Sequence, residues 1–311
     1  MNSYAISEKT MHKIKKKIFL KPFDYEPFSF AAFILGTISG IMGGPVRFPL
    51  KNPCPPYAHH KPKNNREKTE TIYYFHGWGE LMPEKNLGPE TYESSEVFTL
   101  YFSEYRENVR FKTSFGQKQD VKESLQCLKN TYNEERKSIT LVGRSRGGHV
   151  LILLLISLVA NLDNILDEVG IDQKMQQKLI QQIKAGRIII VVPLLNMQKT
   201  LKYHFGEKIG NWWHEKFGPK LTEKLYDPNG WHAEICLENC NKKEFTKPQF
   251  NITYIYALYE NILKNNKDID LFIKQFILFN GMSIKIQGVP GSHFGLAQQE
   301  ALEKELFEFI S

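Results

Sequence analysis

The most informative stretch of this chain is Gly143-Arg144-Ser145-Arg146-Gly147. It follows a short apolar run at 139–142 and opens a longer apolar run at 148–155. The first run predicts a strand and the second predicts a helix. A serine flanked by glycines between them predicts a sharp turn, because glycine has no Cβ to collide with the neighbouring backbone. Such a turn presents the Ser145 hydroxyl at the edge of a sheet.

Apolar and β-branched runs recur along the rest of the chain in alternation with helical patterns. We expect strands at 71–75, 97–102, 139–142, 188–192, 252–258 and 282–286. Helical spacing is found near 121–128, 163–184, 268–278 and 302–310. The helix after Ser145 stays apolar through Ala160, too short for a membrane span, and is expected to be buried. This alternation predicts an α/β fold with a mostly parallel central sheet and helices on both faces.

Length and composition are those of one large globular domain with attachments. The chain has 311 residues, of which 41% are hydrophobic and 24% charged. We expect residues 1–69 to form a basic, partly apolar N-terminal segment and 70–311 to form the main domain. Within that domain, 196–250 is polar and aromatic by turns, and we interpret it as a cap over the site. The alternative is a surface excursion with its own small core.

The front of the chain carries much of the net charge of +7. Residues 27–46 contain no charged side chain, a length that reaches a membrane span, although glycine and serine dilute it. A membrane anchor, a cleaved signal and a helix packed on the main domain all stay open. Contact of residues 9–46 with an anionic membrane surface is one expectation, and a solvated tail is the other. Nucleic-acid binding is not expected, because no reader motif accompanies the charge. The compartment and the oligomeric state are left open.

The four cysteines do not form a disulfide framework in a chain of this length. His232, Cys236 and Cys240 lie four residues apart and suggest a zinc site. That spacing differs from the usual knuckles, and a fourth ligand is missing. We therefore expect no metal, and the cysteines are interpreted as loop thiols, reduced or locally bridged.

Chemically useful side chains come directly after the expected strands. Ser145, His76, Glu260 and His293 all do so. The carboxyl ends of parallel strands meet at one edge, which is where ligands bind in open α/β sheets. These four side chains are therefore expected to converge at that edge.

A serine hydroxyl becomes a nucleophile only when a base takes its proton, and histidine has a suitable pKa. His293 lies in a glycine-rich loop between the last strand and the last helix, so it is the expected base. His149 is expected to point away from the site. A carboxylate must orient the imidazole. Glu260 is favoured for this role, with Asp268 or Asp270 as the alternative.

A tetrahedral intermediate needs backbone N–H donors. We expect one from Arg146, which follows the serine, and one from Trp78 in the sequence His76-Gly77-Trp78-Gly79. His76, Gly77 and Arg144 are candidates to line the site. Arg144 and Arg146 also place positive charge beside the serine. That charge favours an acidic substrate, unless both side chains pair with nearby carboxylates.

Together these motifs resemble those of the α/β-hydrolase superfamily. The H-G-x-G loop, the G-x-S-x-G turn, an acid after the next-to-last strand and a late G-x-H loop come in the family's order. The resemblance covers roughly residues 70–311. It implies Ser145 as nucleophile, His293 as base, Glu260 as acid and the region 196–250 as a lid.

The resemblance implies hydrolysis of a carboxylic ester or thioester through an acyl-serine intermediate, without a metal or organic cofactor. An aromatic cap favours an apolar acyl group. A serine peptidase or acyltransferase on the same fold stays open. So does a non-catalytic binding or membrane-tethered scaffold, since function is decided by the site rather than the fold.

Overall fold

The computed structural model describes residues 57–62, 70–77, 87–101, 117–193, 195, 231–258, 266–290 and 296–310. The chain separates into two compact units, Met1–Gly44 and Pro45–Ser311. Every described residue belongs to the second unit, which is the one presented below. The front segment 9–46, with its expected membrane contact, lies outside the described residues.

A seven-stranded sheet forms the centre of the described unit. In chain order its strands are β1 (Tyr57–His60), β2 (Thr71–Phe75), β3 (Glu96–Leu100), β4 (Thr140–Arg144), β5 (Ile188–Val191), β6 (Ile252–Ala257) and β7 (Lys285–Val289). Across the sheet the order is β1-β3-β2-β4-β5-β6-β7. β1 runs antiparallel to β3, and all other neighbouring pairs are parallel. The predicted mostly parallel sheet is confirmed.

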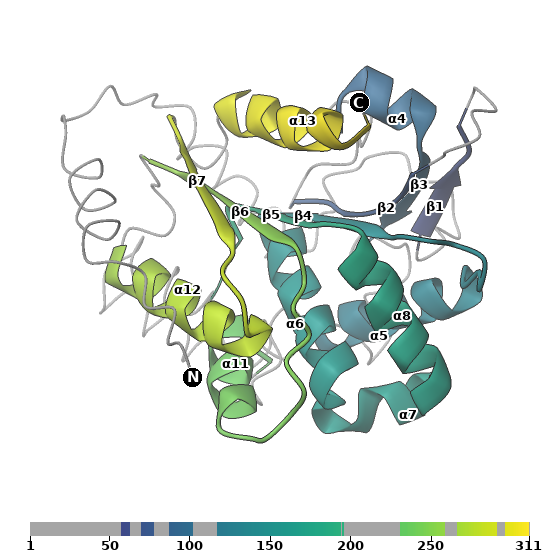
Figure 1. Cartoon of the computed structure of the whole chain (residues 1–311), viewed down its shortest axis with the longest axis vertical. Helices are drawn as coiled ribbons and strands as arrows, with labels where there is room; N and C mark the ends of the chain where they lie inside the picture. The colour runs from purple at the N-terminus through teal and green to yellow at the C-terminus, as the bar shows by residue number, and fades with distance from the viewer. Residues whose placement is uncertain are drawn as a thin grey trace, which may run out of the picture. The chain divides into compact units, whose positions relative to one another are not determined.

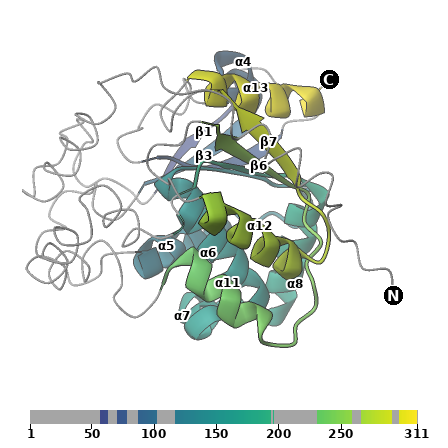
Figure 2. The same cartoon turned by 90° about the vertical axis from the view of Figure 1, so that its left-hand side faces the viewer.

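Helices cover both faces of this sheet (Figures 1 and 2). One face carries α4 (Pro89–Ser94) and α13 (Leu296–Ile310). The other carries α5 (Gln117–Asn130), α6 (Arg146–Ala160), α7 (Ile165–Val169), α8 (Gln173–Ala185), α11 (Ala233–Asn241) and α12 (Asn266–Asn280). A short 3-10 turn, Leu162–Asn164, joins α6 to α7. The predicted α/β layering is therefore confirmed.

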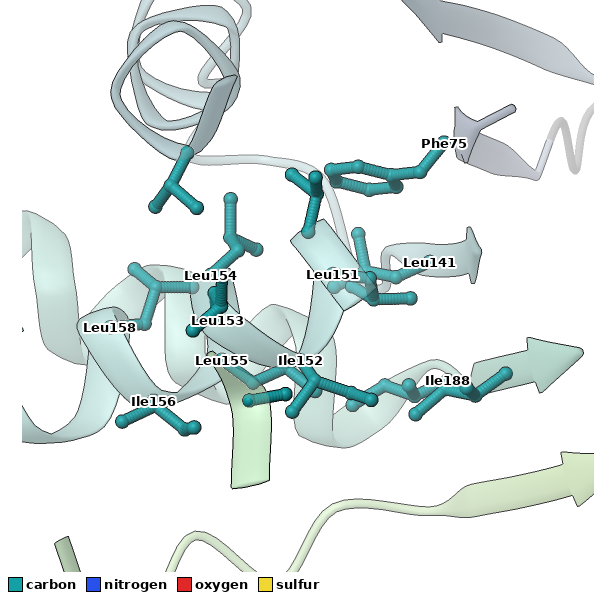
Figure 3. Packing of buried hydrophobic residues seen from close by; sticks show 14 of the residues in the cluster. Phe75, Leu141, Leu151, Ile152, Leu153, Leu154, Leu155, Ile156, Leu158 and Ile188 are labelled. Atoms are coloured by element: carbon teal, nitrogen blue, oxygen red, sulfur yellow. The ribbon is translucent and has the colours of Figure 1, made fainter. Parts of the chain in front are cut away.

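Side chains of the central strands alternate between two hydrophobic cores, one on each face. Leu141 and Ile188 belong to the core on the α6 side, whereas Val142 and Ile189 belong to the core on the α13 side. Figure 3 shows the strand residues Leu141 and Ile188 beside the leucines and isoleucines of α6. Coverage on both faces explains why these strands are continuously apolar in sequence.

The apolar helix that follows Ser145 is confirmed as a core helix. All residues of α6 from Arg146 to Leu158 are buried. Among the described residues, no single helix has the length and hydropathy of a membrane span. Only Arg146–Ala160 and Leu162–Val169 taken together do, and the two are bent by 96° at the break.

The main differences from the sequence predictions lie at turns and edges. The single helix expected over 163–184 is divided, because Gly170 adopts a positive φ of 71° and Asp172 starts a new helix by accepting a hydrogen bond from Met175 N–H. The last strand lies slightly later than the expected 282–286. Strand β1 was missed, and its pairing with β3 means that the sheet begins before residue 70.

The stretch 196–250, expected to form a cap, is described only from residue 231 onward. This part packs into the main core, where α11 lies against α6 and α12 and buries Cys236 and Leu237. Trp231 precedes it, and its indole Nε1–H donates to Asp163 Oδ2 at 2.8 Å. Residues 231–250 are thus part of the main domain. Any cap is restricted to 196–230, a segment that lies outside the described residues.

Asn280 holds the backbone of Phe250, shortly before β6 begins. The chain continues from β6 toward Glu260, the predicted acid. The buried side-chain amide of Asn280 donates to Phe250 O at 2.9 Å and accepts from Phe250 N–H at 2.7 Å. We predict that Asn280→Asp lowers the free energy of unfolding by about 1–3 kcal/mol, because the donor is lost and a carboxylate faces a carbonyl oxygen. Urea unfolding measures this loss.

The matched control is Asn130→Asp at an exposed position. There the side chain only accepts a hydrogen bond from Gln126 Nε2, which a carboxylate also accepts. Its expected change is within about 0.5 kcal/mol. Equal midpoints for Asn280→Asp and wild type would contradict the role assigned to Asn280.

Candidate active site

The strand order reverses at the carboxyl ends of β2 and β4, the place where open α/β sheets have a ligand crevice. From β2 the chain continues to β3 on one side, whereas β4 lies on the other side of β2. Ligands bind at such a reversal of strand order, outside the carboxyl ends of the strands. His76 and Gly77 follow β2, and Ser145 follows β4. The structure therefore brings these three predicted residues to the same point of the sheet edge.

Ser145 has a strained backbone. Its φ is 52° and its ψ is −117°. Residues other than glycine rarely adopt a positive φ. The Ser145 N–H donates to Val191 O at 2.8 Å, and its carbonyl accepts from His149 N–H at 3.2 Å. Strain of this kind costs about 1–3 kcal/mol and is concentrated at functional sites. The conformation is the sharp strand-to-helix turn that the sequence predicted.

The glycines around Ser145 are required by close backbone approach. A Cβ on Gly147 would lie 2.0 Å from Phe75 O, and one on Gly143 would lie 2.9 Å from Gly147 O. On Gly148 it would lie 2.9 Å from Pro193 Cβ. The turn is thus wedged against the end of β2 and the residues after β5. No larger side chain fits at Gly147 without moving the backbone that precedes His76.

His76 is fully buried beside this turn. Its Nδ1 donates a hydrogen bond to Gly77 O at 2.7 Å, which identifies the tautomer as Nδ1-protonated. The pKa of His76 is lowered to about 4, chiefly by burial; the hydrogen bond to Gly77 acts in the opposite direction, and the Arg146 charge makes a smaller contribution that lowers the pKa. The imidazole is therefore neutral at pH 7. This agrees with the structural role that the sequence favoured over that of a base.

The two arginines beside Ser145 have their side chains inside the molecule. Arg146 Nη2 lies 2.8 Å from Asp120 Oδ2, and both side chains are 2% exposed. Arg144 is 6% exposed, and its Nη2 lies 3.5 Å from Gln298 Oε1 on α13. Arg146 therefore pairs with a nearby carboxylate, which was the alternative to an exposed positive charge. Its charge is neutralised by a carboxylate and does not favour an acidic substrate.

His149 is buried one turn into α6. Its Nε2 accepts a hydrogen bond from Ala233 N–H at 2.9 Å, and its ring stacks on His232 with centroids 6.4 Å apart. Burial holds the pKa of His149 well below its usual value, and the neighbouring His232 and Arg146 charges act in the same direction. The hydrogen bond to Ala233 joins α6 to α11.

Three predicted site residues, Trp78, Glu260 and His293, lie outside the described residues. The structure does place the strands from which two of them follow. β6 ends at Ala257 and β7 ends at Val289, and the two strands are parallel neighbours. The chain therefore leaves both at the same sheet edge as Ser145.

The alternative acids, Asp268 and Asp270, lie within α12 rather than directly after a strand. Asp270 is close enough to Tyr256 on β6 that its charge adds to the effect of burial in raising the pKa of that phenol. Asp270 thus acts on a residue near the carboxyl end of β6.

The cysteines of the suggested zinc site are buried. Cys236 and Cys240 both face the core from α11. Burial raises the pKa of Cys240, which disfavours the thiolate that zinc requires. Within the described ranges, no group of three histidine, cysteine or acidic side chains is placed to hold a metal ion.

No protein-family model and no curated protein matches the sequence. Among solved structures, the fold is similar to inhibited esterase B from Lactobacillus rhamnosis, with 12% identity over 90% of this chain and 93% of the esterase, and a TM-score of 0.52. A tributyrin phosphonate complex of the same esterase has 12% identity, coverages of 98% and 99% and a TM-score of 0.50. A Pyrococcus furiosus esterase has 16% identity, coverages of 78% and 80% and a TM-score of 0.47.

At these identities the likeness concerns the fold. The chain has the α/β-hydrolase fold, and the resemblance inferred from its sequence motifs is confirmed at that level.

The buried His76 predicts a defined dependence of stability on pH. Its pKa is about 4 in the folded protein against an ordinary value of 6.5, so the unfolded chain binds the proton first. Its contribution is complete above pH 6.5 and is lost as the pH falls toward 4. We predict that wild type loses on the order of 2 kcal/mol more than His76→Asn between pH 7 and pH 5. Denaturant unfolding at both pH values tests this, and parallel losses would contradict it.

Proposed function

We propose that this protein is a serine hydrolase that cleaves a carboxylic ester or thioester, with Ser145 as its nucleophile. The observation that carries the proposal is the backbone of Ser145, with φ 52° and ψ −117° at the carboxyl end of β4. A non-glycine residue held in that conformation by three close-packed glycines needs a reason beyond folding. Presenting a hydroxyl at the sheet edge is such a reason.

In the proposed reaction, Ser145 Oγ attacks the acyl carbon while His293 takes the hydroxyl proton. The tetrahedral intermediate then expels the alcohol or thiol, which receives that proton from the imidazolium. Water attacks the acyl-serine in the same way and releases the acid. Glu260 is proposed to hold the imidazole in the reactive tautomer and to stabilise its cation.

The negative charge of the intermediate is proposed to be stabilised by the N–H groups of Arg146 and Trp78. Arg146 is the first residue of α6, where backbone N–H groups point out of the helix and the helix dipole favours negative charge. Gly77, which precedes Trp78, is held by His76 at the end of β2. Both proposed donors therefore come from segments anchored at the same crevice.

Fold similarity and composition support an apolar acyl group. Esterase B, with the same fold, has been solved with a tributyrin phosphonate inhibitor. The segment 196–230, the proposed cap, includes the aromatic residues Trp212, Trp213 and Phe217. The reaction requires neither a metal nor an organic cofactor, because nucleophile, base and charge stabilisation all come from the protein.

Covalent labelling with a fluorophosphonate probe tests the nucleophile. We predict labelling of wild type and none of Ser145→Ala or His293→Ala, because the hydroxyl must be present and deprotonated. The control Ser94→Ala removes a half-buried hydroxyl that donates to Glu90 O and Thr91 O within α4, and it is expected to label like wild type. An unlabelled, folded wild type would favour the non-catalytic scaffold.

Hydrolysis of p-nitrophenyl esters tests the acid. We predict that Glu260→Gln lowers kcat by about 10³-fold or more, because the imidazole loses its orienting carboxylate. Asp270→Asn and Asp268→Asn serve as matched controls and are expected to change kcat by less than about threefold. The reverse order, with Glu260→Gln active and an α12 variant inactive, would move the acid to that helix.

A further inference from the structure

The buried ion pair next to Ser145 gives a role to a side chain that the proposed reaction does not touch. Asp120 lies in the first turn of α5, and its Oδ2 is 2.8 Å from Arg146 Nη2. We propose that Asp120 is a positioning residue for hydrolysis, which holds Arg146 so that its backbone N–H faces the oxygen that becomes negatively charged. The inference rests on the proposed function and deepens it.

Folding stability alone does not require this pair. Removing two charges from water is costly, and replacing a buried ion pair with apolar side chains of similar volume is often neutral or stabilising. The site is nevertheless fully closed, since Arg146 is 1% and Asp120 is 4% exposed. The surrounding core is also rich in leucine and isoleucine, which shows that apolar packing is available there.

The ion pair between Asp120 and Arg146 constrains Arg146, whose backbone N–H is one of the two donors proposed for the oxyanion. An exposed arginine side chain is flexible and transmits little constraint to its own backbone. Arg146, in contrast, is among the largest fully buried side chains, so its rotamer is fixed by packing and by the carboxylate. Because α5 packs directly on α6, Asp120 ties a second helix to the first residue after Ser145.

Steady-state kinetics on a p-nitrophenyl ester test the proposal. Asp120→Asn is expected to lower kcat by about 10- to 100-fold with KM within about twofold, because a displaced donor weakens only the transition state. Rates are normalised to the fluorophosphonate-labelled fraction, which corrects for unfolded protein. Asp120→Glu keeps the charge and is expected to recover part of the loss.

The matched control is Glu96→Gln. Glu96 forms an ion pair with Arg136 at 2.9 Å, and it starts β3 at the opposite, amino-terminal edge of the sheet. Breaking that pair removes an ionic contact of similar length without touching the crevice. Its kcat is expected to stay within about twofold of wild type.

A second readout separates positioning from a general structural role. Sulfur accepts hydrogen bonds weakly, so an intact oxyanion site favours an oxoester over the matching thionoester. Asp120→Asn is expected to lower the ratio of the two kcat/KM values by at least about fivefold. A protein that is merely less stable loses both activities equally, and an unchanged ratio would overturn the proposal.

Should Asp120→Asn fail to fold, the double variant Asp120→Leu with Arg146→Met replaces the pair by apolar side chains. It is expected to fold and to show the same loss of kcat and of the oxoester preference. Wild-type kcat and ratio in any folded Asp120 variant would refute the positioning role alone. Ser145→Ala with wild-type activity would instead refute the proposed function, and this inference with it.

Discussion

The contact between the turn at Gly147 and the end of β2 is the constraint on which this structure depends. The Phe75 carbonyl occupies the space that a side chain on Gly147 would need. This wedge keeps α6 close beneath the sheet and forces Ser145 into its unusual backbone conformation. Burial of α6 along its length supplies the packing energy that offsets the strain. The packing of α6 therefore both forms the core and holds the backbone of the candidate site.

Electrostatics around the turn follow from the same burial. Burial disfavours the protonated form of His76 and of His149, and the buried Arg146 guanidinium is paired with the Asp120 carboxylate. The second buried guanidinium, that of Arg144, lies against the side-chain amide of Gln298. An environment of fixed dipoles without mobile charge is well suited to stabilising charge that appears only during a reaction.

The sequence predicted the layers of the fold because central parallel strands and core helices have strong, long apolar patterns. The run Ile188–Val191 and the helix Arg146–Ala160 are examples in which burial on all sides leaves no ambiguity. Strand β1 was missed because its sequence, Tyr57–His60, is short, polar and only partly buried at the sheet edge. The break at Gly170 depended on a local positive φ, which periodicity does not reveal.

Within the candidate site, the sequence predicted the conformation at Ser145 and the neighbourhood of His76. It left open whether Arg146 is exposed or paired, because Asp120 is 26 residues away in sequence and only the packing of α5 on α6 brings it near. It also interpreted all of 196–250 as a cap or as a surface excursion with its own small core. The aromatic residues of that stretch gave no sign that Trp231 and α11 belong to the core.

Pro193 and Ala233, which flank the stretch between β5 and α11, both contact the first turn of α6. Pro193 lies against Gly148, and Ala233 N–H donates to His149 Nε2. Closing a longer loop between fixed ends costs only about 0.6 kcal/mol for each doubling of its length. A change in the number of residues between these two anchors is therefore expected to cost little stability and to leave the sheet in place.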